Sequence, residues 1–160
     1  MKPVIQSHLN YRGSLTRRMQ RCWISWRSQP ASVRKIFLRF RNLDLSAVDR
    51  IMMDCYSNLG PMPRQPSCML RSLLLMIITK CVSIPSWVAT LHTSQFYAIL
   101  CGFDPKDVPG VGTFYDFIDR LWILATPNFS SHIKPPVKQK VKKPKGKGQK
   151  AASINVHCQE

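Results

Sequence analysis

Acidic residues are scarce in this chain. Its 160 residues include 8 Asp and Glu against 24 Lys and Arg, which gives a formal net charge of +16. The only Glu is the last residue, Glu160. With so few carboxylates, the chain has few residues that could serve in acid–base catalysis or as oxygen ligands of a metal ion. The excess of positive charge instead favours a polyanionic partner, either nucleic acid or an anionic membrane surface.

Motifs of common enzyme and metal sites are also missing. The six cysteines form no CxxC pair and match no zinc-site spacing, and the four histidines are scattered. The chain has no glycine-rich phosphate loop and no nucleophile–base pair at a recognisable spacing. We therefore expect no enzymatic activity, no metal site and no cofactor, and the scattered thiols fit a reducing cytoplasmic compartment.

Long apolar runs are absent as well. The run at 73–78 is too short to span a bilayer, and the uncharged stretch at 81–103 carries Pro85 and many Ser and Thr residues. The first 20 residues lack the apolar centre of a secretory signal, although the acid-free stretch before Asp44 has the composition of a mitochondrial transit peptide. We expect a cytoplasmic chain that does not span a membrane.

The distribution of charge predicts three parts. Residues 1–50 hold eleven Lys and Arg against two Asp, residues 51–133 hold five of each sign, and residues 134–150 hold eight Lys and no acid. We predict a basic arm at 1–43 with one short amphipathic helix, a helical domain at 44–126, and a Lys-rich tail at 127–160. The tail is expected to be disordered because of its Lys, Pro and Gly content, and residues 1–31 because they show no sustained period. The alternative for residues 1–31 is a basic aromatic arm that contacts phosphates and bases, with Trp23 and Trp26 among Arg17, Arg18, Arg21 and Arg27.

Apolar residues recur at helical spacing through the middle of the chain. In residues 32–41 the stripe is Val33, Ile36, Phe37 and Phe40, with basic residues largely off it. Further helices are predicted at 46–57, at 67–81, after Pro85, at 96–100 and at 114–124, separated by Pro- and Gly-containing segments at 60–66 and 103–112. No strand pattern is present. The predicted fold is an all-α, small helical bundle of helix-turn-helix-like type.

Helix ends are marked by local signals. Ser46 with Asp49 and Thr113 with Asp116 have the spacing of capping boxes. Ser94 is expected to cap the helix at 96–100, and Gly102 is expected to end it.

Four segments of this middle part follow one another in a familiar order. They are Gly60-Pro61 with Arg64 and Pro66, MLRSLLL at 69–75, FYAILCGF at 96–103 and VPGVGTFYDFIDRLW at 108–122. In this order and spacing they resemble the N-terminal domain of InsH-type insertion-sequence transposases. The resemblance covers about 63 of the 160 residues and implies a helical DNA-binding domain.

In that family the helical domain precedes an RNase H-like core, whose two aspartates and one glutamate hold two metal ions. This chain has no carboxylate between Asp119 and Glu160, and residues 151–160 do not resemble the family's continuation. We therefore assign no catalytic residue and expect a truncated or frameshifted transposase, with a genuine short protein as the alternative.

The resemblance and the charge together predict that the chain binds double-stranded insertion-sequence DNA without catalysing transposition alone. Phosphate contacts are expected from basic residues of the amphipathic helix, the connector and the tail: Arg34, Lys35, Arg39, Arg41, Arg64, Lys138, Lys140, Lys142 and Lys143. Which helix reads bases is open; Tyr115 and Arg120 are candidates, with core support as the alternative. Arg71 is expected either to contact DNA or to pair with an Asp.

Two other functions are considered. The apolar helix at 67–81 could form a dimer with itself or with full-length transposase. Residues 32–41 and the lysine tail could bind a membrane surface, a partner that the sequence favours less than DNA.

Overall fold

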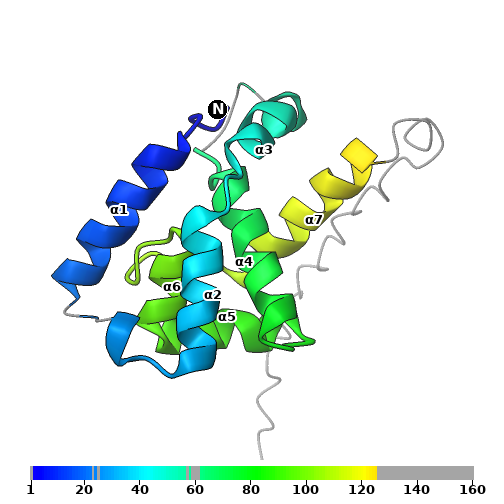
Figure 1. Cartoon of the computed structure of the whole chain (residues 1–160). Coiled ribbons are helices and arrows are strands. Elements are labelled where there is room, and N and C mark those ends of the chain that lie inside the picture. Colours follow the sequence, from blue (N-terminus) through cyan, green and yellow to red (C-terminus); the bar gives the residue numbers. More distant parts are fainter. Residues whose placement is uncertain (1, 23, 25, 57, 59–61, 126–160) are drawn as a thin grey trace, which may run out of the picture.

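The structure, a computed structural model, describes residues 2–22, 24, 26–56, 58 and 62–125. Within these residues it is all-helical and contains no strand, as predicted (Figure 1). The elements in chain order are α1 (His8–Arg21), η1 (Trp26–Ser28), α2 (Ala31–Asn42), α3 (Ser46–Ile51), η2 (Met52–Cys55), α4 (Pro66–Ile78), α5 (Ile84–Thr93), α6 (Gln95–Cys101) and α7 (Val111–Ala125). The predicted Lys-rich tail lies outside the described residues.

Residues 8–21 form a helix, whereas the sequence analysis predicted a disordered basic arm. That prediction is wrong because Tyr11, Leu15 and Met19 recur every four residues and form a buried stripe, each at most 5% exposed. The Ser7 hydroxyl caps α1 by accepting a hydrogen bond from the backbone N–H of Asn10 at 3.2 Å. The helix packs against α6, and its stripe belongs to the same hydrophobic core as the later helices.

The amphipathic helix predicted at 32–41 is confirmed as α2. Phe37 and Phe40 are buried, and Val33 and Ile36 are half-buried. The ring of Phe37 lies 6.3 Å from the ring of Phe96, measured between centroids, so aromatic packing holds α2 against α6.

α4 and α6 occupy the centre of the bundle (Figure 1). α6 contacts α1, α2, α4 and α5, and its residues 98–101 are fully buried. α4, the most apolar helix predicted from the sequence, buries Cys68, Met69 and Leu75. Its last turn departs from that pattern, because Ile77 and Ile78 are exposed.

The predicted boundaries of α6 are confirmed. The Ser94 hydroxyl accepts a hydrogen bond from the backbone N–H of Tyr97 at 3.4 Å, and Gly102 ends the helix with φ +98°. A Cβ at residue 102 would lie 2.7 Å from the Cys68 sulfur, so both the backbone conformation and the space require glycine. α5 and α6 are joined through Ser94 alone, which is shorter than the turn of three or four residues in a helix-turn-helix motif. The helix-turn-helix-like arrangement therefore stays a prediction.

Both predicted capping boxes are wrong. The N–H of Ser46 donates to the carboxylate of Asp44 at 2.8 Å, and this hydrogen bond holds the pKa of Asp44 below its usual value. α7 begins at Val111, so Thr113 lies inside the helix and not before it. The helix predicted at 46–57 also changes form, because α3 ends at Ile51 and the 3-10 helix η2 follows.

Asp49, instead of capping its own helix, ties three segments together from the core. Its carboxylate is fully buried and accepts hydrogen bonds from the backbone N–H of Gln6 at 3.2 Å and from the Gln65 amide at 3.1 Å. It also accepts from the backbone N–H of Ser67 at 2.7 Å and from the Ser67 hydroxyl at 3.0 Å. Since Ser67 lies in the first turn of α4, Asp49 satisfies a helix N-terminus from a different helix.

Candidate nucleic-acid interface

Basic side chains without partners gather on α1 and α2. The first 43 residues of the chain contain ten Lys and Arg and no acid. Six of these ten form no side-chain hydrogen bond or ion pair with any residue that the structure describes: Arg12, Arg17, Arg21, Lys35, Arg39 and Arg41. Both helices that carry these side chains pack on α6. We call these six residues the basic face.

Four of the predicted DNA contacts lie on α2. Arg34, Lys35 and Arg39 are exposed, Arg41 is half-buried, and all four lie off the buried Phe37–Phe40 stripe. Arg34 donates a hydrogen bond to the backbone carbonyl of Arg27 at 3.2 Å, whereas the other three belong to the basic face.

The three basic-face residues of α1 are not among the predicted DNA contacts, and Arg17 and Arg21 entered the sequence analysis only through the alternative of a basic aromatic arm. Arg17 and Arg21 are exposed and Arg12 is half-buried, on the sides of the helix away from its buried stripe. The signal that could have found them is the four-residue spacing of the apolar residues from Tyr11 to Met19, preceded by the capping Ser7.

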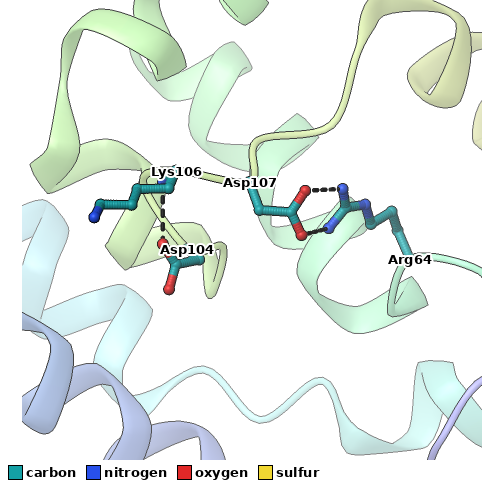
Figure 2. A network of polar contacts seen from close by, with 4 residues as sticks. All are labelled: Arg64, Asp104, Lys106 and Asp107. Atoms are coloured by element: carbon teal, nitrogen blue, oxygen red, sulfur yellow. Dashed lines mark hydrogen bonds and ion pairs between the residues drawn. The ribbon is translucent and has the colours of Figure 1, made fainter.

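Arg64, a fifth predicted contact, is already engaged. Its guanidinium donates hydrogen bonds to both carboxylate oxygens of Asp107, and Figure 2 shows the two groups facing each other. The pair lowers the pKa of Asp107 and raises that of Arg64. In the same loop the backbone N–H of Lys106 donates to Asp104 at 3.0 Å. Because Asp107 neutralises it, Arg64 attracts a phosphate much less strongly than a basic-face residue does.

The remaining predicted contacts fall on the Lys-rich tail. Lys138, Lys140, Lys142 and Lys143 lie outside the described residues.

Arg71 neither reaches the surface nor pairs with an Asp in the structure. Its side chain is 2% exposed, and its guanidinium carbon lies 3.6 Å from the centroid of the Tyr11 ring. The Arg71 Nη2 donates to the carbonyl of Leu43 at 3.5 Å, and its Nε and Nη1 have no hydrogen-bond partner among the described residues. The Tyr11 hydroxyl donates to the carbonyl of Leu100 at 2.7 Å, and burial raises the pKa of Tyr11. Arg71 therefore supports the packing of α1.

The rest of the described chain balances its charge. Residues 44–125 contain six Lys and Arg against seven Asp. Arg120, a candidate base reader, lies 4.7 Å from the centroid of the Tyr56 ring, measured from its guanidinium carbon, while Tyr115 is 50% exposed on α7. The positive charge of the described bundle is therefore concentrated on α1 and α2.

Other kinds of site find little support in the described residues. They contain no group of three or more His, Cys, Asp or Glu side chains that could hold a metal ion. None of the described helices combines the length and the apolar content needed to cross a membrane. Comparison with family models, curated proteins and solved structures finds no match. The resemblance to InsH-type transposases therefore stays a prediction from the sequence.

Proposed function

We propose that the chain binds double-stranded DNA through the basic face, as the DNA-binding part of an InsH-type transposase, and does not cleave DNA on its own. The observation that carries this proposal is a set of six cations that form no ion pair among the described residues, on two helices that contain no acid and both pack on α6. Side chains of this kind displace counterions from phosphates, and this release drives most of the affinity of proteins for DNA. The proposed location is the cytoplasm.

The salt dependence of binding tests the proposal. If about six phosphates are engaged, the logarithm of the binding constant falls with the logarithm of salt concentration at a slope near −5. Fluorescence anisotropy with a labelled duplex at about 50–200 mM salt measures this slope. No binding to any duplex at ~50 mM salt would refute the proposal.

Paired variants locate the binding face. Replacing Arg17, Arg21 and Arg39 together by Ala is expected to make the slope shallower by roughly three, since each lost phosphate contact removes about one unit. Lys106→Ala is the control, because Lys106 is an exposed cation outside α1 and α2. If Lys106→Ala changes the salt slope as much as each basic-face substitution does, the phosphate contacts lie outside the basic face. Duplexes carrying the ends of an insertion sequence, compared with random duplexes, measure whether binding is sequence-specific.

Self-association is a second candidate function. The observation that favours it is a group of exposed apolar side chains at the end of α4, where Ile77 is 65% exposed, Ile78 is 44% exposed and Val82 just beyond is 97% exposed. A dimer of the chain, or of the chain with full-length transposase, would cover them. Light scattering at tens of micromolar tests this candidate, and a strict monomer would refute it.

A further inference from the structure

A groove of about 390 Å³ runs between the two helices of the proposed DNA-binding face. Its floor includes Met19 of α1 and Phe37 of α2, both buried. Its rim includes the exposed Thr16 and Gln20 on the α1 side and the half-buried Arg41 on the α2 side. Ile24 and the exposed Arg27, from the segment between the two helices, complete the lining. The groove thus combines an apolar base with hydrogen-bonding groups and two arginines.

The size of the groove restricts what it can hold. Pockets for small organic ligands measure about 300–1,000 Å³, and this groove lies near the lower end of that range. A double helix is far too wide to enter it, whereas one nucleotide is of suitable size. The floor is also fixed in place, because the ring of Phe37 packs on that of Phe96 and Met19 is 5% exposed.

The chemistry of the lining points to a flat, anionic group. Phosphates favour Arg because its guanidinium forms two parallel charge-assisted hydrogen bonds, and Arg41 has no such partner among the described residues. The amide of Gln20 can both donate and accept, and the hydroxyl of Thr16 can accept, at the edges of a base. The apolar floor suits the face of the same base. The first 43 residues contain no acid, and the next acid along the chain, Asp44, accepts a hydrogen bond from the backbone N–H of Ser46.

We propose that the groove holds one unpaired nucleotide of a bound nucleic acid, with its base over Met19 and Phe37 and its phosphate at Arg41. This inference rests on the proposed nucleic-acid binding and deepens it. Taking a base out of a duplex costs a few kcal/mol, whereas a base in a single strand is already available. The groove should therefore make the protein prefer DNA with unpaired bases over a blunt duplex at equal salt.

The test compares four probes with the full chain. They are a blunt duplex, a single strand of the same length, that strand with abasic sites, and vesicles of anionic phospholipid. We expect the single strand to bind about tenfold more tightly than the duplex, which corresponds to about 1.4 kcal/mol. The abasic strand should lose this preference.

Three variants separate the groove from the rest of the surface. Thr16→Trp fills the groove without changing charge. Arg41→Ala removes one of its two arginines, the one proposed to hold the phosphate. Both variants are expected to abolish the tenfold preference. Arg39→Ala removes the same charge from the same helix outside the groove and is expected to weaken strand and duplex binding by the same factor. Thermal melts confirm that all three variants fold.

The outcomes distinguish this inference from the function on which it rests. Equal binding of strand and duplex, or a preference that survives both groove variants, would overturn the groove proposal and leave duplex binding intact. Groove-dependent binding to anionic vesicles without a preference for the single strand would also overturn it. Failure to bind any nucleic acid at ~50 mM salt would overturn the proposed function itself.

Discussion

Replacing Asp49 by Ala should be among the most destabilising single substitutions in this chain. The change removes a fully buried acceptor of four hydrogen bonds. Two of the donors belong to Ser67, which is 3% exposed. Without Asp49 both would lack an acceptor, and each buried unsatisfied donor lowers the free energy of unfolding by about 1–3 kcal/mol. The Gln6 and Gln65 donors are only partly buried and can recover water. We therefore expect the free energy of unfolding to fall by about 3–5 kcal/mol.

Thermal and urea unfolding followed by circular dichroism measure this loss. At about 2–4 °C per kcal/mol for a chain of this size, the Tm should fall by about 10 °C. Asp49→Asn keeps the shape and one acceptor oxygen, so it should lose about half as much. Asp54→Ala is the matched control, because Asp54 has a 93% exposed side chain and a surface ion pair with Lys2 that is worth at most about 1 kcal/mol. A loss below ~1 kcal/mol for Asp49→Ala, or equal losses for the Ala variants of Asp49 and Asp54, would refute the reasoning.

Three further predictions follow from the same structure. Arg71→Met should change the free energy of unfolding by no more than about 1 kcal/mol. The reason is that two nitrogens of the buried guanidinium have no partner among the described residues, and the cost of their desolvation offsets the contact with the Tyr11 ring. A loss above ~3 kcal/mol in urea unfolding would contradict this. Cys68 and Cys101 should resist iodoacetamide at pH 8 in the native protein and react after unfolding, because burial raises the pKa of Cys101 to about 12 and raises that of Cys68; mass spectrometry of the labelled peptides checks this. Arg64 lowers the pKa of Asp107, so the wild type should be slightly more stable than Asp107→Asn above the usual carboxyl pKa of about 3.9. This difference in stability should disappear as the pH falls through the lowered pKa. A difference that grows in acid would contradict the prediction.

Much of the helical content was predictable because it depends on local patterns. The apolar spacing around Phe37 and the turn signals at Ser94 and Gly102 act within one or two helical turns, and the structure confirms α2 and α6 close to their predicted bounds. The exception is α1, whose stripe is only Tyr11, Leu15 and Met19 among many polar residues. Its stability comes from packing on α6, which the sequence of the segment alone does not reveal.

The partners of polar groups were much less predictable than the helices. Asp49 has the spacing of a local cap, yet it accepts hydrogen bonds from residues 43 and 18 positions away. Arg64 likewise pairs with a residue 43 positions away. Such pairs depend on how helices meet in space, whereas the exposed cations of α2 followed directly from the position of its buried stripe. The α2 part of the basic face was therefore predictable, whereas the α1 part depended on a weaker three-residue stripe that the sequence analysis did not recognise as a helix.

Three of the seven described acids are engaged by groups outside the basic face. Asp49 is enclosed at the start of α4, Asp107 is held by Arg64, and Asp54 faces Lys2. α1 is attached to the core by contacts that involve no carboxylate. The Tyr11 hydroxyl donates a hydrogen bond to a backbone carbonyl, and the Tyr11 ring packs against the Arg71 guanidinium. The fold thus anchors both helices without an ion pair to any basic-face cation among the described residues, although Asp104 and Arg21 line one and the same pocket. A polyanion that bound there, as we propose, would have to break no ion pair formed between the basic face and the described residues.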